Sequence, residues 1–156
     1  MLWRRRIEPF ARPAFHWLAR RLRGLTLGVR GLVVDDRGRV LLIQHTYTPG
    51  WHMPGGGVER GETAEQALGR ELVEEAGVEI LGRARLLSVH SNHAFFRGDH
   101  VLVYRIDRWR TCAATSRGEI HAVDWFAPDA LPANVTAGTR RRIAEALGAA
   151  EHDPHW

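Results

Sequence analysis

Apolar residues occur along this chain in short runs that are separated by glycine, proline and charged residues. Two runs rich in Val, Leu and Ile flank the turn sequence DDRGR within residues 25–47, and this pattern predicts a β-hairpin. Further strands are predicted at residues 80–92, 99–109 and 119–128, with a connecting loop at residues 93–98. The prolines and glycines of TPGWHMPGGG predict another loop, because they interrupt regular elements.

Residues 63–76 have the clearest helical pattern. Thr63 is suited to cap the amino end, with Gln66 three residues later as its partner in a capping box. Gly77 is suited to end the helix, since a glycine readily takes the left-handed conformation of a helix C-terminus. A well-defined helix is therefore expected at the centre of the chain.

A last helix is predicted at residues 136–147, with Ile143 and Leu147 facing inward, and residues 149–156 are predicted to form a flexible tail. The order of helices and strands matches neither strict βα alternation nor an all-β protein. We therefore predict one α+β domain at residues 25–148, in which helices cover a mixed β-sheet.

The first 24 residues form a basic segment outside that domain. Apolar residues recur there at helical spacing, with arginines between them. One interpretation is a helix that packs its apolar side on the domain; the other is a surface helix that contacts anionic lipid or nucleic acid. The segment lacks the continuous apolar core and cleavage site of a secretory signal, and no apolar run is long enough for a transmembrane helix, so we expect a cytoplasmic protein.

Composition restricts the chemistry. The chain has 156 residues, a net charge of +4 and a pI of about 10.4, and its basic residues are all arginines. Without lysine it can form neither a Schiff base nor a Walker-type phosphate loop. Cys112 is the sole cysteine, which excludes an internal disulfide and a multi-cysteine zinc site; we expect it to be a half-buried free thiol.

Three glutamates of the central helix point to a cation. Glu71, Glu74 and Glu75 stand at positions i, i+3 and i+4, on a face continuous with the apolar stripe. Carboxylates placed there repel one another, and more strongly as water is removed. Oxygen clusters suit Mg²⁺ or Mn²⁺. The alternative is a solvated face balanced by arginine, but the guanidinium of Arg70 alone cannot balance three carboxylates.

The segment GGVERGETAEQALGRELVEEAGV resembles the signature of the Nudix hydrolases. That signature is a glycine, five residues, a glutamate, seven residues, and then Arg-Glu-aliphatic-any-Glu-Glu-any-Gly-aliphatic. Its fixed positions are occupied here by Gly56, Glu62, Arg70, Glu71, Leu72, Glu74, Glu75, Gly77 and Val78. The flanking stretches WHMPGGG and EIHAVDWFAPDALP also resemble this family, so the resemblance extends over most of residues 25–148.

The resemblance implies a Nudix fold, an α/β/α sandwich with a mixed sheet, and Mg²⁺-dependent hydrolysis of a pyrophosphate bond. Glu74 and Glu75 resemble the main Mg²⁺ ligands of the family. Glu71 resembles a further ligand or the base that activates water, and the Gly55 carbonyl resembles a backbone ligand. Arg70 resembles the residue that orients the carboxylates.

Other positions of the signature resemble structural residues, namely Gly56, Glu62 and Gly77. Many family members also use a glutamate outside the signature as metal ligand or base. Glu119 is the candidate for that role, with Asp124 and Asp99 as alternatives. Whether Glu71 or Glu119 is the base is left open by the resemblance.

Substrate selection is expected in the loops. The candidate substrate-binding residues are Trp51, His52, Phe95, Phe96 and Arg97. An aromatic ring could stack on a base and an arginine could pair with phosphate; the alternative is that these aromatics pack within loops and the histidine is at the surface.

The predicted substrate is a nucleoside diphosphate linked to a further group, either a nucleoside triphosphate or a sugar nucleotide. Two other functions stay open. One is an RNA 5′-end pyrophosphohydrolase, suggested by the arginine-rich first segment and the high pI. The other is a non-catalytic nucleotide sensor, which the complete set of glutamates disfavours. A homodimer and peripheral membrane contact are further alternatives for its partners.

Overall fold

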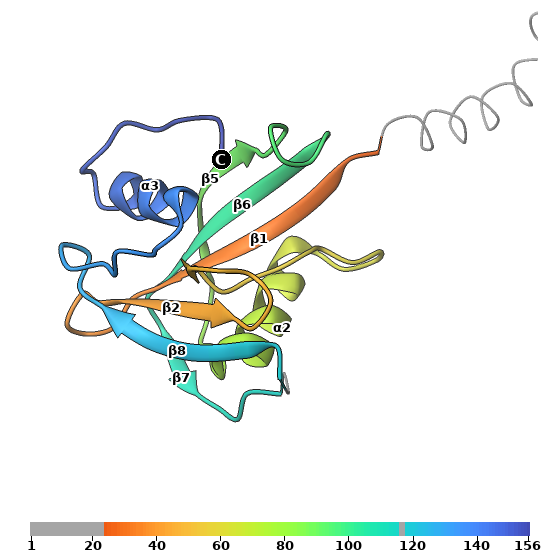
Figure 1. Ribbon diagram of the computed structural model, residues 1–156. Helices are drawn as coiled ribbons and strands as arrows, with labels where there is room; N and C mark the ends of the chain where they lie inside the picture. Colours follow the sequence, from red (N-terminus) through yellow and green to blue (C-terminus); the bar gives the residue numbers. More distant parts are fainter. Residues whose placement is uncertain (1–23, 116–117) are drawn as a thin grey trace, which may run out of the picture.

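The computed structural model describes residues 24–115 and 118–156 (Figure 1). The helix predicted for the basic first segment therefore lies outside the described residues, apart from Gly24. The strands are β1 (Thr26–Val33), β2 (Val40–His45), β3 (Trp51–His52), β4 (Val78–Ile80), β5 (Arg85–Ser91), β6 (Asp99–Ile106), β7 (Trp109–Thr111) and β8 (Ile120–Phe126). The helices are α2 (Ala64–Ala76) and α3 (Ala137–Ala146).

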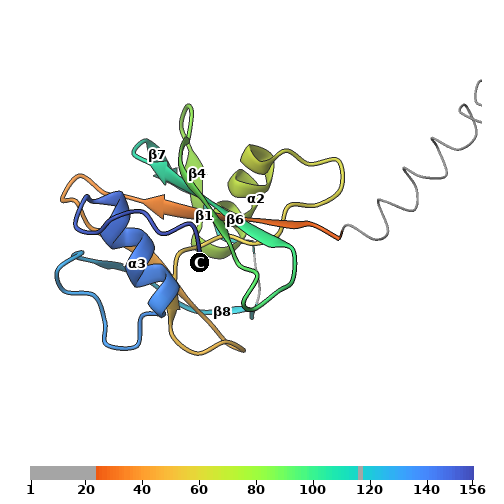
Figure 2. The same ribbon diagram turned by 90° about the horizontal axis from the view of Figure 1, so that it is seen from above.

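The strands form three small sheets. In the first, of order β1-β6-β5, β1 is parallel to β6 and β5 is antiparallel to it, so the sheet is mixed as predicted. The second has the order β3-β2-β8 and is antiparallel, and the third pairs β4 with β7. Helices α2 and α3 lie on opposite sides of β1 and β6 in both views (Figures 1 and 2).

The predicted hairpin at residues 25–47 is wrong in its pairing, although its turn is present. Asp35 accepts hydrogen bonds from the backbone N–H groups of Arg37 and Arg39 and from the Arg39 guanidinium, which closes the turn. Beyond a single bridge between Val34 and Val40 the two strands separate, β1 to pair with β6 and β2 with β8. An apolar run predicts a strand but does not determine its partner.

Two apolar clusters lie on the two sides of β1. Val29 and Val33 belong to the cluster that contains the buried side chains of α2, whereas Leu32 belongs to the cluster that contains Ile143 of α3. Because β1 is covered on both faces, its sequence is a nearly continuous apolar run rather than an alternating one. The predicted sandwich of helices around a mixed sheet is therefore confirmed.

Helix α2 has the predicted ends. The Thr63 hydroxyl accepts the Gln66 N–H, and the Gln66 side chain accepts the Thr63 N–H, as in a capping box. Gly77 ends the helix with φ of 60°. Its carbonyl accepts the N–H of Cys112, a half-buried free thiol as predicted.

Helix α3 differs from the prediction on its inward face. Ile143 is 2% exposed, as expected, but Leu147 is 44% exposed. Arg142, one residue before Ile143, is buried instead. The apolar spacing did not reveal this, because a buried arginine needs polar partners that come from distant segments.

Residues 149–156 were predicted to be a flexible tail, and the structure instead attaches their end to β5. The N–H of Ser91 donates to the Pro154 carbonyl at 2.7 Å, and the N–H of Trp156 donates to the Ser91 carbonyl at 2.9 Å. The tail was predicted from its place after the last helix, but backbone hydrogen bonding to a sheet edge can hold such a segment whatever its side chains. Neither described helix has the length and hydrophobicity to cross a membrane.

Candidate active site

The three glutamates of α2 face inward to different degrees. The side chains of Glu71 and Glu75 are 13% and 11% exposed, whereas that of Glu74 is 42% exposed. The prediction that this face meets the rest of the protein is thus confirmed for the first two. Carboxylates so deprived of water need either a cation or a proton.

Arg70 links three of the carboxylates. Its guanidinium donates two hydrogen bonds to Glu62, at 3.0 and 3.1 Å, and one to Glu71 at 2.8 Å; it approaches Glu74 at 3.4 Å. The hydrogen bonds from Arg70 lower the pKa of the Glu62 carboxyl. Glu62 also accepts the N–H of Glu59, so it joins the preceding loop to the helix.

Among residues 24–115 and 118–156, no arginine forms a hydrogen bond or ion pair with Glu75, although the charge of Arg30 acts on it. One of its oxygens accepts the Gly55 N–H at 2.7 Å, and the other lies 3.7 Å from His45 Nε2. Burial raises the pKa of the Glu75 carboxyl to about 7, and the charges of Glu71 and Glu119 act in the same direction. Burial also lowers the pKa of His45, so this histidine is neutral at pH 7 and supplies no counter-charge.

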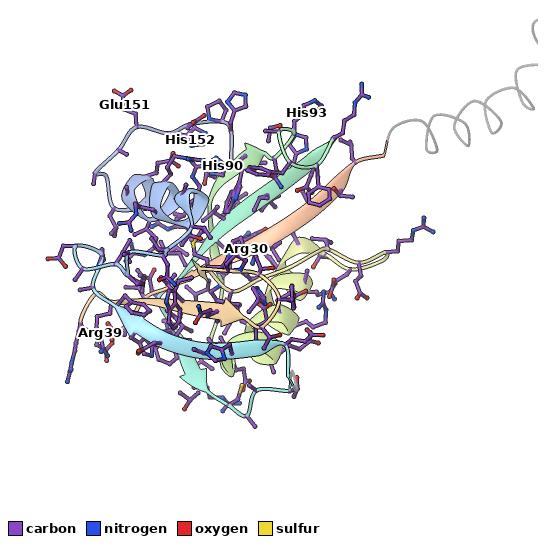
Figure 3. The ribbon with its side chains drawn as sticks, viewed as in Figure 1. Arg30, Arg39, His90, His93, Glu151 and His152 are labelled. Carbon is purple, nitrogen blue, oxygen red and sulfur yellow. The ribbon has the colours of Figure 1, made fainter. Side chains whose placement is uncertain are left out.

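Arg30 is a site residue that we did not predict. It projects from β1 into the interior near α2 (Figure 3) and donates to the carbonyls of Met53 and Gly55, at 3.0 and 2.6 Å. Burial lowers its pKa, while the negative charges of Glu75 and Glu71 oppose that change. The signal in the sequence was an arginine inside the otherwise apolar run LGVRGLVV.

The Gly55 carbonyl, predicted as a metal ligand, thus already accepts a hydrogen bond from Arg30. Gly55 has a φ of +137°, and a Cβ there would lie 3.0 Å from Arg30 Cα. At Gly56 a Cβ would lie 2.6 Å from Glu71 Cδ, so the Glu71 carboxyl rests directly against the backbone of the loop. Gly55 is required by the close approach of the β1 backbone, whereas a Cβ at Gly56 would displace the Glu71 carboxyl, which supports a structural role for Gly56.

Glu119 is exposed on the segment before β8, where its carbonyl accepts the Thr46 N–H at 2.9 Å. Its charge contributes to the raised pKa of Glu75, so the structure brings it near the cluster. The alternatives are less well placed. Asp124 caps the N–H of Trp125, and both carboxylate oxygens of Asp99 already accept hydrogen bonds.

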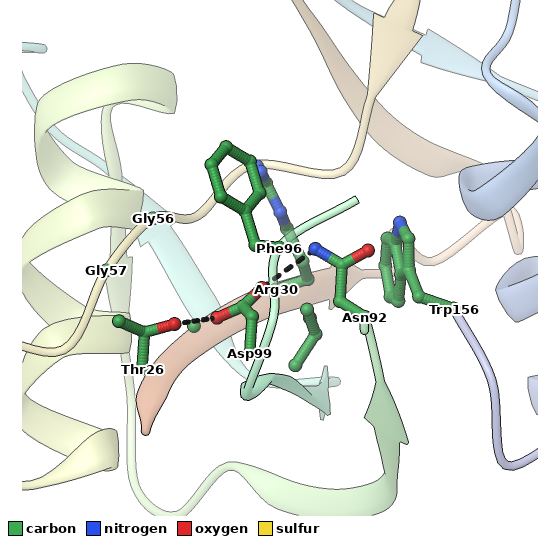
Figure 4. A pocket seen from close by; sticks show the side chains of 10 residues that line it. Thr26, Arg30, Gly56, Gly57, Asn92, Phe96, Asp99 and Trp156 are labelled. Atoms are coloured by element: carbon green, nitrogen blue, oxygen red, sulfur yellow. Dashed lines mark hydrogen bonds between the residues drawn. The ribbon is translucent and has the colours of Figure 1, made fainter. Parts of the chain in front are cut away.

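A cavity of about 360 Å³ adjoins the loop at Gly56 and Gly57 (Figure 4). Its lining includes Gly56 and Arg30, which contact Glu71 and the Gly55 carbonyl respectively. Phe96 is the one predicted substrate residue that lines this cavity. Asn92 and Trp156 also line this cavity, and neither was predicted as a site residue.

The other predicted substrate residues lie elsewhere. Trp51 packs edge-on against Phe126 at 4.8 Å and belongs to the cluster under α3. His52 lies near His45, with ring centroids 5.6 Å apart. Phe95 is 76% exposed and Arg97 is also exposed. Loop position alone did not distinguish the side chains that turn toward the cavity from those that turn to solvent.

The carboxylates of the signature at residues 56–78 do not lie together as a compact set of metal ligands in this conformation. Among the described residues, the three side chains that could hold a metal ion, with ligand atoms within 4.8 Å of one another, are His90, Glu145 and His152. Glu71 and Glu74 instead accept hydrogen bonds from Arg70, and Glu75 accepts one from the Gly55 N–H. The possible ligand atoms of the signature are nevertheless all oxygens, and its carboxylates outnumber the positively charged side chains near them. This composition suits a hard divalent ion.

Comparisons with known proteins agree on one family. A family model described as NUDIX domain matches residues 24–147. The chain is 34% identical over 128 residues to a MutT-like protein of Streptomyces ambofaciens, a match that covers 81% of this chain and 80% of that protein. It is 29% identical over 118 residues to a Bacillus subtilis protein provisionally named 8-oxo-dGTP diphosphatase, covering 76% and 77%.

A shorter match joins the chain to an RNA pyrophosphohydrolase of Edwardsiella ictaluri, with 40% identity over 82 residues that cover 52% of this chain and 44% of that protein. Among solved structures, the MutT NUDIX hydrolase of Burkholderia pseudomallei superposes with a TM-score of 0.66 and 32% identity. That superposition covers 77% of this chain and 96% of the other.

Proposed function

The chain belongs to the NUDIX domain family and is a Nudix hydrolase; from this premise we propose that it hydrolyses the pyrophosphate linkage of nucleoside triphosphates with Mg²⁺. The observation that carries the proposal is the row of three carboxylates on α2, two of them largely removed from water, near a cavity whose lining includes Gly56, Arg30 and Phe96. The cluster suits a cation bound to phosphate, and the cavity suits an organic group attached to it.

The residues that would hold the ion are Glu71, Glu74, Glu75 and the carbonyl of Gly55. When bound, Mg²⁺ supplies positive charge that stabilises phosphate oxygens and lowers the pKa of a water. Mn²⁺ prefers the same oxygen donors and is expected to substitute. The burial of the Glu75 carboxyl supports this assignment, since its neighbour His45 is neutral at pH 7 and the single charge of Arg30 is shared with Glu71.

The protein's own groups have separate tasks. Arg70 fixes the orientation of Glu71 and of the Glu62 that ends the loop. A carboxylate must accept the proton of the attacking water, and both Glu71 and Glu119 are candidates for that base. Arg30 is half-buried in the lining of the cavity, near the charges of Glu71 and Glu75, where it could pair with a phosphate.

The substrate assignment to nucleoside triphosphates is supported by the similarity to MutT-like proteins and to the Bacillus subtilis protein. The second candidate is the 5′-triphosphate end of RNA, favoured by the shorter match to an RNA pyrophosphohydrolase and by the high pI. Sugar nucleotides form a third substrate class. A nucleotide sensor without activity is disfavoured because every glutamate position of the signature at residues 56–78 is occupied by glutamate.

A substrate panel tests the proposal. The purified protein of 156 residues is incubated with deoxy- and ribonucleoside triphosphates, sugar nucleotides and 5′-triphosphorylated RNA, with Mg²⁺ or Mn²⁺, and products are separated by ion exchange. We expect release of pyrophosphate or phosphate from the triphosphates, and no release after Glu75→Gln. Cleavage of RNA ends alone would replace the proposed substrate, and full activity of the Glu75 variant would refute the assignment of the ion.

A further inference from the structure

Exposed apolar side chains lie at the end of the molecule where β1 begins. Among residues 24–115 and 118–156, three of the four most exposed large hydrophobic side chains are here: Phe95 is 76% exposed, Leu25 is 71% exposed and Phe96 is 69% exposed. Phe95 and Phe96 belong to the turn between β5 and β6, which lies beside the start of β1 in both views (Figures 1 and 2). Single apolar residues are normal at a protein surface, but a group of them indicates a contact surface.

Local contacts hold these side chains at the surface. The N–H groups of Phe95 and Phe96 both donate to the Asn92 carbonyl at 3.0 Å, which closes the turn. The turn lies directly against Leu25, because a Cβ at Gly98 would be 3.8 Å from the Leu25 side chain. The two phenylalanines are therefore presented by a hydrogen-bonded turn, next to the leucine at the start of the described chain.

The charges around this surface permit an anionic partner. Arg97 is exposed in the turn at residues 92–99. Asp99, the one carboxylate of the turn, accepts a hydrogen bond from a neighbouring side chain at each of its oxygens. The loop before α2 adds one exposed acidic and one exposed basic side chain, Glu59 and Arg60, whose charges offset each other. Within the turn and the start of β1, no carboxylate is therefore left to repel a negatively charged surface.

The sequence that immediately precedes this surface is both basic and apolar. Residues 1–23 contain seven arginines and one glutamate, a net charge of +6, whereas the whole chain has +4. The other residues together carry a net charge of −2, so the high pI comes from this segment. The same 23 residues include nine large apolar side chains, among them two tryptophans and two phenylalanines. Arginine combined with tryptophan, phenylalanine and leucine is typical of segments that bind the interface of anionic bilayers.

We propose that residues 1–23 together with Leu25, Phe95 and Phe96 form a surface that binds an anionic membrane. The arginines are attracted to negative lipid headgroups, and the apolar side chains enter the boundary between headgroups and acyl chains. Leu25 favours a membrane over RNA, because leucine has neither a hydrogen-bonding group nor an aromatic ring for a base. Since Phe96 also lines the cavity, binding through this surface places the candidate active site next to the bilayer (Figure 4).

The test is co-sedimentation of the 156-residue chain with vesicles of phosphatidylcholine, alone or mixed with phosphatidylglycerol. We expect binding to the anionic vesicles, little binding to phosphatidylcholine alone, and weaker binding at high salt. Leu25→Ser combined with Phe95→Ser should weaken binding at least about tenfold, because both side chains leave water in the bound state. Replacing Arg20, Arg21 and Arg23 together by glutamine should also weaken it at least about tenfold.

The matched control is Leu147→Ser, at an exposed leucine that ends α3. Helix α3 lies toward the other end of β1 in both views, so this variant should bind vesicles like the parent chain (Figures 1 and 2). Circular dichroism checks that every variant is folded. Glu75→Gln should also bind vesicles like the parent chain, because membrane binding does not depend on the proposed reaction. The two proposals are thereby tested separately.

A second measurement detects contact of the turn itself with lipid. In a chain carrying Cys112→Ser, an environment-sensitive fluorophore is attached through Phe95→Cys or, as control, through Leu147→Cys. Anionic vesicles should shift the emission to shorter wavelength at position 95 and leave it unchanged at position 147. The proposal is overturned by absence of binding to anionic vesicles, by equal binding of the Leu25 and Phe95 double variant, or by an unshifted fluorophore at position 95. Binding of single-stranded RNA without binding of vesicles would also overturn it, and would assign the arginines to nucleic acid.

Discussion

Replacing Glu75 by glutamine should stabilise the metal-free protein while abolishing its activity. The folded chain buries this carboxyl and raises its pKa from 4.5 to about 7. Because the folded-state pKa lies above the unfolded one, the penalty is absent below about pH 4.5, grows as the pH rises, and is complete above about pH 7. The full shift corresponds to about 3 kcal/mol.

Glutamine removes the charge but keeps an oxygen that can accept the Gly55 N–H. Between pH 5 and pH 8 the variant should therefore gain on the order of 2 kcal/mol relative to the parent chain. Chemical denaturation in EDTA at several pH values measures this difference. Mg²⁺ should stabilise the parent chain at pH 8 and the variant much less, since ligands stabilise only the state that binds them.

The matched control is Glu74→Gln, which neutralises the adjacent carboxylate at a side chain that is 42% exposed. Because water solvates that side chain, its replacement should change the stability in EDTA at pH 8 less than Glu75→Gln does. If the denaturation midpoints of Glu75→Gln and the parent chain run parallel from pH 5 to pH 8, burial does not penalise the Glu75 carboxylate. The physical argument for a bound cation would then be lost, whatever the activity of the variant.

Three further predictions follow from individual residues. Glu119→Gln should lower kcat at least about tenfold, or by about 1.4 kcal/mol, if Glu119 is a ligand or the base; an unchanged kcat in steady-state assays would leave Glu71 as the candidate. Gly56→Ala should lower kcat with little change in secondary structure by circular dichroism, because its Cβ would lie 2.6 Å from Glu71 Cδ; full activity would show that this contact is dispensable. Thr63→Ala should destabilise the fold by about 1 kcal/mol in urea denaturation through loss of its cap on Gln66, and Thr63→Ser should restore most of it.

The central helix and its carboxylates could be predicted from sequence because their determinants are local. Thr63, Gln66 and Gly77 contact groups within a few residues, and helical periodicity places Glu71 and Glu75 on one face. The signature around them reports the same local geometry, and the NUDIX family model covers it. Arg30 was missed because its partners, the carbonyls of Met53 and Gly55, lie more than twenty positions away.

The partners of the strands could not be predicted in the same way. The run that forms β1 has no preference in its own sequence between an antiparallel neighbour across the turn and the parallel strand β6. Likewise, Arg142 is buried where its guanidinium contacts groups from outside α3, the His155 carbonyl at 2.6 Å and the His90 ring at 2.9 Å. Burial of a charge depends on such distant partners, so the apolar pattern of α3 could not indicate it.

The sequence by itself determined the helix, its caps, the carboxylate face and the family, because each depends on residue spacing along one continuous segment. Only the tertiary structure decided which residues line the cavity. Arg30 comes from β1, Asn92 directly follows β5, and Trp156 comes from the segment that pairs with the end of β5. Long-range backbone pairing brings these segments together, and backbone N–H and C=O groups are the same in every residue other than proline. Their pairing therefore leaves no pattern of its own in the sequence.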